Sequence, residues 1–238
     1  IYFGDTAHLP YGEKSASAIQ SYTLKIAEML LQRGCKMLLV ACHSISAAAY
    51  EALQNYVADR ALLVNVIEPV IEHLGCKYHN KTVGLIGTRQ TVKSNIYNKK
   101  IVSLDANITF RSLATPLLVP IIEEGFFEHK LIDLVLAEYL SKDILRDIDA
   151  LILGCTHYPI IKNSVINYYK QKVAIIDAAT IVAEEVKQLL MQQELINDSA
   201  VVGTKHFYVS DYTDAFVACA KMFFGDNVCL EYYPLWDE

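Results

Sequence analysis

Short apolar runs alternate along the chain with longer segments in which apolar residues recur at helical spacing. The clearest helical segment is Ser15–Arg33, and Gly34 follows it in the position that commonly ends a helix. The next segment, Lys36–Ala41, is an almost unbroken apolar run between two helical patterns. Such a run is typical of a strand that is buried on both faces of a parallel sheet.

The rest of the chain continues the same alternation. Further strands are predicted at Ile1–Phe3, Ala61–Ile67, Thr82–Ile86, Ile108–Leu113, Ala150–Leu153, Ala174–Asp177 and His206–Val209. Further helices are predicted at Ser46–Val57, after Pro69 to Leu74, from Gln90, and at Leu131–Lys142, Thr180–Gln193 and Asp214–Phe224. Regular alternation of strands and helices predicts an α/β fold with mostly parallel sheets.

One sequence pattern occurs twice. Leu38–Ser44 and Leu151–His157 each contain an apolar strand, a small residue, a cysteine and two polar residues. Because both halves end a strand in a cysteine, we expect two pseudo-symmetric α/β domains that face each other across a cleft. We assign residues 1–66 and 179–238 to the first domain, which carries Cys42, and residues 67–178 to the second, which carries Cys155.

Composition and charge narrow the class of partner. Hydrophobic residues make up 53% of the chain, charged residues 20%, and the net charge is −6. The lysines and arginines are scattered rather than grouped in a stripe, so we expect no nucleic-acid partner. No apolar run approaches the roughly 18 residues of a membrane-spanning helix, so we expect no membrane association. Small molecules are the expected ligands.

The cysteines raise a question of compartment and reactivity. Six cysteines without C-x-x-C spacing, in a chain with no visible secretory signal, favour reduced thiols in a cytoplasmic protein. A cysteine in an apolar setting is more often a small buried residue than a reactive one. We give that interpretation to four of them: Cys35, Cys76, Cys219 and Cys229.

Cys42 and Cys155 differ because each directly follows a predicted strand and precedes a helix or turn. In open α/β sheets, ligands bind at the carboxyl ends of the strands. A helix N-terminus there lowers a thiol pKa from about 8.5 and attracts anions. Racemisation needs a proton removed from one face of a carbon and delivered to the other, and one thiol on each wall of a cleft suits that task. No lysine lies in a recognisable pyridoxal-binding motif, so we expect no cofactor. We also expect no metal.

Several segments carry a family resemblance. Ile1-Tyr2-Phe3-Gly4-Asp5-Thr6-Ala7, followed by Pro10-Tyr11-Gly12, closely resembles a glutamate racemase signature. So do Gly87-Thr88-x-x-Thr91, the segment from Pro120 to Gly125 with Glu123 and Glu124, and Gly154-Cys155-Thr156-His157-Tyr158-Pro159. The last is the most specific, and together the segments cover most of the chain.

The resemblance implies roles for individual residues. Cys42 would act on the D-enantiomer, Cys155 on the L-enantiomer, and His157 would assist Cys155. Thr156 would bind the amino or carboxylate group of the substrate. Other substrate-binding residues would be Pro10, Tyr11, Gly12, His43, Ser44, Thr88 and Thr91. The implied substrate is glutamate, the implied product D-glutamate is a peptidoglycan precursor, and we expect a homodimer.

The chain departs from the family pattern at two places. The usual Cys-Asn-Thr is Cys42-His43-Ser44, which replaces a neutral amide with a larger, titratable ring. The family also begins with a strand and an Asp-Ser-Gly loop whose aspartate assists the first cysteine, and no such segment precedes Ile1 in this sequence. We expect a chain lacking that segment to be a poor racemase.

Other interpretations remain open from the residues alone. Cys42-His43 and Cys155-x-His157 are conceivable zinc ligands or a cysteine hydrolase pair, although their spacing is unusual. Thr88 and Thr91 would equally serve to cap a helix, Tyr11 to pack a turn, and Glu123-Glu124 to form a solvated turn. Rival functions are a racemase for aspartate or another acidic amino acid, a thiol-dependent decarboxylase, and an impaired homologue kept for binding.

Overall fold

A computed structural model describes residues 1–104, 106–197, 199, 203–212, 216–217, 220–221, 225 and 228–237. Its strands are β1 (Tyr2–Gly4), β2 (Met37–Val40), β3 (Leu62–Asn65), β4 (Thr82–Gly87), β5 (Thr109–Ala114), β6 (Ala150–Gly154), β7 (Ala174–Ile176), β8 (Phe207–Val209) and β9 (Leu230–Tyr232). Its α-helices are α1 (Ala16–Gln32), α2 (His43–Ala48), α3 (Tyr50–Val57), α4 (Glu68–Lys77), α5 (Arg89–Ser94), α6 (Ile96–Val102), α7 (Leu118–Glu123), α8 (Lys130–Leu140), α9 (Lys162–Tyr168) and α10 (Ala178–Gln192). Short 3-10 helices lie at Thr6–His8, Tyr11–Glu13, Ala58–Arg60, Phe126–Glu128, Asp143–Leu145 and Tyr158–Ile161.

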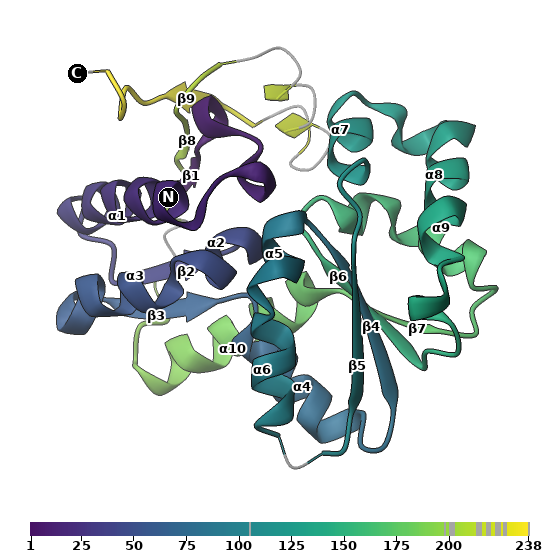
Figure 1. The fold of residues 1–238 in the computed structure, drawn as a ribbon. Helices are drawn as coiled ribbons and strands as arrows, with labels where there is room; N and C mark the ends of the chain where they lie inside the picture. Colours follow the sequence, from purple (N-terminus) through teal and green to yellow (C-terminus); the bar gives the residue numbers. More distant parts are fainter. Residues whose placement is uncertain are drawn as a thin grey trace.

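The largest sheet has the strand order β5-β4-β6-β7, and all its strand pairs are parallel. Alternate residues of β6 point to opposite faces. Leu151 and Leu153 join the core beneath α7, α8 and α9, whereas Ala150 and Ile152 join the core beneath α4, α6 and α10. Figure 1 shows these two groups of helices on either side of the sheet. Strand β6 is therefore buried on both faces.

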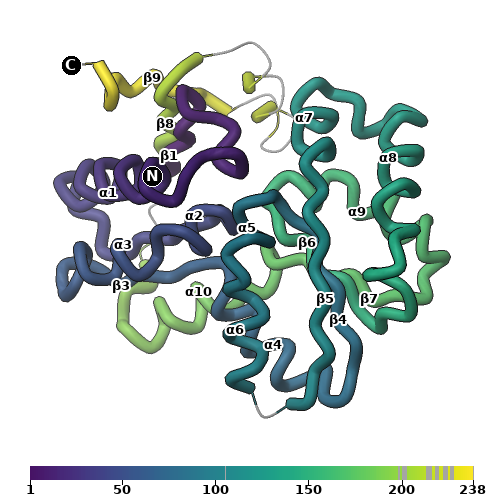
Figure 2. Tube along the Cα trace, viewed as in Figure 1, coloured from purple at the N-terminus to yellow at the C-terminus, as the bar shows by residue number. Residues whose placement is uncertain are grey.

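The other part of the molecule contains two smaller parallel sheets, β1-β8-β9 and β2-β3. Helices α1 and α3 pack on β2 through a core that includes Ala27, Leu38, Leu53 and Val57. Because β8 and β9 pair beside β1, the end of the chain lies next to its beginning, as the purple and yellow segments of Figure 2 show. The α/β fold with parallel sheets is confirmed, while the exact domain boundaries stay a prediction.

Local sequence signals predict several element ends correctly. The Ser15 side chain accepts a hydrogen bond from the Ala18 backbone N–H and begins α1, and Gly34 follows that helix with a φ of 76°. The predicted strands all occur, within a few residues of their expected bounds. Helices α7 and α9 and strand β9 were not predicted. The predicted helix at Asp214–Phe224 lies largely outside the described residues.

Two predictions need correction. Strand β2 is not buried on both faces, because Leu38 is buried but Leu39 is 45% exposed. An apolar run shows that a strand has a buried face but does not show how many faces other elements cover. The predicted helix Ser46–Val57 is two helices that meet at Ala49, and the first begins earlier, at His43. This places Cys42 at the N-cap of α2.

The cysteines predicted to be ordinary core residues are not all buried. Cys76 and Cys229 are exposed, and Cys35 is partly buried against the core of α1 and α3. Cys76 lies in the last turn of α4, where the helix leaves the core. Cys219 lies outside the described residues. Within the described ranges, no helix combines the length and the apolar character needed to cross a membrane.

Candidate active site

Cys42 follows β2 and occupies the N-cap position of α2. Burial raises the pKa of its thiol to about 11, although hydrogen bonds from the backbone N–H groups of Ile45 and Ser44 act in the opposite direction. Repulsion from Cys155 raises this pKa further. The expectation that a helix N-terminus would lower the pKa of Cys42 is therefore wrong, because loss of water around the sulfur outweighs the helix. At neutral pH Cys42 is a protonated thiol.

Cys155 follows β6 and has a different environment. The Sγ atom of Cys155 lies 3.6 Å from Nδ1 of His157, and Nε2 of the same ring lies 3.1 Å from Oε1 of Glu123. Burial by itself would lower the pKa of His157, but its interactions with Cys155 and Glu123 raise that pKa to about 10. His157 is consequently a cation at neutral pH. The ring of His157 thus places a positive charge next to the Cys155 sulfur.

Three hydroxyl groups lie together between α2 and α5. The Oγ atom of Ser44 is 2.9 Å from Oγ1 of Thr88 and 3.5 Å from Oγ1 of Thr91, and the two threonine oxygens are 3.1 Å apart. Thr88 also accepts a hydrogen bond from the Thr91 backbone N–H and thereby caps α5. The capping interpretation is thus confirmed for Thr88 but not for Thr91, which lies within α5, and the cap coexists with a polar cluster that joins α2 to α5.

The turn Pro10-Tyr11-Gly12 packs directly against this cluster. A Cβ atom placed on Gly12 would lie 2.6 Å from Cβ of Thr88, so only glycine permits this approach. Tyr11 is buried, and its hydroxyl donates a hydrogen bond to Asp5 at 2.5 Å. Tyr11 is therefore more than a packing residue in a turn.

His43 and Thr156 follow the two cysteines but differ in exposure. Thr156 is exposed. His43 is only 3% exposed, and its Nδ1 atom is hydrogen-bonded to the Tyr97 hydroxyl at 3.0 Å. Burial lowers the pKa of His43 to about 4, partly opposed by Asp177, so the ring is neutral at neutral pH. One ring nitrogen of His43 is thus already used within the protein.

Sequence reasoning missed two residues that the structure connects to the site. Glu123, interpreted as part of a solvated turn, is the last residue of α7 and forms the ion pair with His157, whereas its neighbour Glu124 is exposed. Asp5 is 9% exposed and accepts the Tyr11 hydrogen bond. Both lie in segments that carry the family resemblance, and that resemblance was the signal in the sequence that could have indicated them. No feature of the neighbouring sequence distinguishes Glu123 from Glu124.

The arrangement provides two thiols of opposite character, one neutral and one beside a cation. Each follows a strand of a parallel sheet in its own part of the molecule. The two parts meet beside Cys42, where Ser44 contacts Thr88, the residue that follows β4, and β4 pairs with β6. A neutral thiol donates a proton and a thiolate accepts one. The hydroxyl groups and the Pro10–Gly12 turn supply polar and backbone groups nearby.

Comparison with known proteins identifies the family. Residues 1–186 match the sequence model described as Asp/Glu/Hydantoin racemase. The chain belongs to this family. A glutamate racemase of Geobacter metallireducens is 37% identical over 228 residues, which are 96% of this chain and 84% of the relative. This Asp/Glu/hydantoin racemase family member is accordingly a racemase enzyme.

Solved structures of related racemases have the same fold. The glutamate racemase of Francisella tularensis, solved in complex with D-glutamate, is 34% identical and superimposes with a TM-score of 0.91. The alignment covers 100% of this chain and 88% of that one. The Thermus thermophilus glutamate racemase, in complex with beta-chloro-D-alanine, is 33% identical with a TM-score of 0.85, over 98% of this chain and 85% of that one.

Proposed function

We propose that this racemase interconverts L- and D-glutamate without a cofactor, by proton transfer between the substrate and two cysteines, Cys42 and Cys155. Its similarity to glutamate racemases over nearly the whole chain supports the substrate. The observation that carries the mechanism is the contrast between the thiols. Burial raises the pKa of Cys42, while Cys155 faces His157, whose pKa is raised by its contacts with Cys155 and Glu123.

In the proposed cycle the L-enantiomer meets Cys155 as a thiolate and Cys42 as a thiol. The Cys155 thiolate takes the proton from Cα, and the electron pair of the broken C–H bond stays on the substrate. The Cys42 thiol then delivers its proton to the opposite face of Cα, giving the D-enantiomer and a Cys42 thiolate. The enzyme is left with Cys155 protonated and Cys42 ionised, the state required for the reverse reaction.

The carbanion formed at Cα needs stabilisation, because an amino-acid Cα–H is much less acidic than a thiol. Hydrogen-bond donors around the substrate carboxylates would supply it. The Pro10–Gly12 turn, the hydroxyl groups of Ser44, Thr88 and Thr91, and the exposed Thr156 are the groups we assign to substrate binding. His157 acts on Cys155 as the cation that stabilises its thiolate.

Isotope exchange in D2O tests the two-base mechanism. Starting from L-glutamate, the D-glutamate formed early should carry deuterium at Cα while the remaining L-glutamate does not, because each cysteine serves one face. Cys42→Ser and Cys155→Ser should each lower racemisation by at least about 100-fold. Full racemisation by both variants, or early deuterium in both enantiomers of the wild-type reaction, would rule the mechanism out.

The rival functions give different results. Substrate profiling with aspartate and other acidic amino acids distinguishes a different racemase, and release of carbon dioxide would reveal a decarboxylase. An impaired homologue would bind glutamate in calorimetry without any deuterium appearing at Cα. In a bacterial cell the proposed product, D-glutamate, would serve peptidoglycan synthesis in the cytoplasm. We also propose a homodimer, which light scattering of the purified protein would test.

A further inference from the structure

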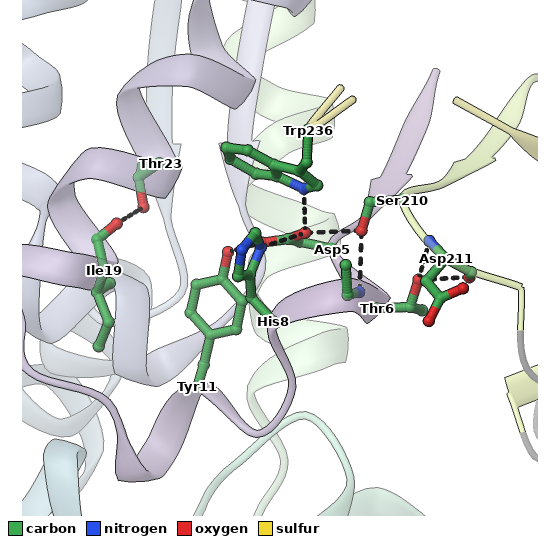
Figure 3. Close-up of polar contacts among 10 residues, drawn as sticks. Asp5, Thr6, His8, Tyr11, Ile19, Thr23, Ser210, Asp211 and Trp236 are labelled. Carbon is green, nitrogen blue, oxygen red and sulfur yellow. Dashed lines mark hydrogen bonds and ion pairs between the residues drawn. The ribbon is translucent and has the colours of Figure 1, made fainter. Parts of the chain in front are cut away.

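The Asp5 carboxylate joins the beginning of the chain to its end. Its Oδ1 atom accepts hydrogen bonds from the Ser210 hydroxyl at 2.7 Å and from Nε1 of Trp236 at 2.8 Å. Its Oδ2 atom accepts the Tyr11 hydroxyl at 2.5 Å and lies 2.9 Å from Nδ1 of His8. Figure 3 shows these side chains converging on Asp5. Most of the hydrogen-bonding capacity of this buried carboxylate is used by protein groups.

Trp236 is held in its place by several aromatic contacts. Its ring meets His8 edge-on, with ring centroids 4.5 Å apart, and Tyr22 at 5.4 Å. His8 in turn stacks on Tyr22 at 3.9 Å, and Nζ of Lys25 lies 5.2 Å from the Trp236 ring centroid. These contacts fix the indole so that its N–H points at Asp5 rather than at solvent.

Tyr11 connects this network to the candidate active site. Burial, the Asp5 carboxylate and, to a smaller extent, Cys42 raise the pKa of the Tyr11 hydroxyl. The phenol is anchored at its hydroxyl by the hydrogen bond to Asp5. The next residue, Gly12, is the one in tight contact with Thr88. A shift of Tyr11 would consequently move the turn against the hydroxyl cluster.

We propose that Trp236 is a positioning residue for the substrate-binding turn Pro10–Gly12. Its N–H orients the Asp5 carboxylate, and Asp5 orients Tyr11 and the turn that follows. The C-terminal segment, far from both cysteines in sequence, thereby fixes one wall of the site. The inference rests on the proposed racemase function for its kinetic consequence, but the Trp236–Asp5 contact itself can be measured separately.

Trp236→Phe is the sharpest variant, because it keeps an aromatic ring and removes the N–H. We expect KM for glutamate to rise about tenfold and kcat to stay within about twofold, because the variant loses a group that positions bound substrate. The thermal unfolding midpoint should change little. Tyr232→Phe is the matched control. It removes a hydroxyl that donates to Asp237 at 2.6 Å in the same C-terminal segment, and it should leave both constants unchanged. An unchanged KM in Trp236→Phe would overturn the proposal.

A spectroscopic readout separates this inference from the proposed function. The chain has one tryptophan, so its indole N–H gives a single NMR cross-peak. We expect slow exchange of that proton with solvent and a large shift of its resonance in Asp5→Asn. An unshifted, rapidly exchanging signal would refute the positioning role even if the enzyme racemises glutamate. A slowly exchanging indole proton in a chain that does not racemise glutamate would instead contradict the proposed function.

Discussion

Tyr97 and His43 form a buried hydrogen bond of 3.0 Å between the Tyr97 hydroxyl and Nδ1 of the imidazole. Their rings also stack, with centroids 6.2 Å apart and planes inclined by 25°. His43 begins α2 immediately after Cys42, and Tyr97 lies on α6 within the core beneath the large sheet. The pair therefore ties the helix that carries the first thiol to the part of the molecule that carries the second.

Tyr97→Phe should lower the free energy of unfolding by about 1–3 kcal/mol, because it leaves a buried ring nitrogen without its partner. Urea denaturation measures the change. The same substitution in a His43→Phe background should lower the free energy of unfolding much less, since the ring nitrogen that loses its partner is no longer present. Equal costs in both backgrounds would show that the hydrogen bond does not stabilise the protein.

Acid should destabilise the protein through His43. Burial lowers its pKa in the folded protein from 6.5 to about 4, so as the pH falls the unfolded chain takes up this proton first. The stability that His43 contributes is fully present above pH 6.5. As the pH falls towards 4, the free energy of unfolding decreases by roughly 3 kcal/mol through this group. His43→Asn should reduce the slope of unfolding free energy against pH in this range. Parallel curves for variant and wild type would contradict the prediction.

Glu123→Gln should weaken the Cys155 side of the site. Loss of the carboxylate lowers the pKa of His157 from its value of about 10, so the ring loses its proton at a lower pH. We expect the alkaline limb of the pH–rate profile to move to lower pH and kcat to fall about tenfold or more. Glu124→Gln, at the exposed neighbouring carboxylate, is the control and should retain the wild-type profile. The ion pair has no catalytic consequence if the two variants behave alike.

Gly12→Ala should displace the substrate-binding turn. The added Cβ would lie 2.6 Å from Cβ of Thr88, a distance at which one of the two residues must move. We expect KM for glutamate to rise about tenfold with a smaller change in kcat. Gly203→Ala, where a Cβ would meet no atom within 4 Å, is the control. A wild-type KM in Gly12→Ala would mean that the turn does not contact the substrate.

The sequence by itself determined the α/β class and the placement of the two cysteines after strands. Apolar runs and helical spacing mark the elements, and local capping residues such as Ser15, Gly34 and Thr88 mark their ends, because these signals depend on neighbours within a few positions. Cys42 and Cys155 were recognisable for the same reason. Cys155 follows β6 directly and Cys42 follows β2 after Ala41, so the strand itself fixes the place of each at the carboxyl end.

Only the tertiary structure decided the partners and protonation states of the site. Glu123 reaches His157, His43 meets Tyr97, and Trp236 reaches Asp5 through the packing of elements that are distant in sequence. The pKa of a buried group depends on all the charges and atoms around it, and no local pattern contains them. That is why the expected low pKa of Cys42 was wrong, and why the asymmetry between the two thiols became visible only in the folded chain.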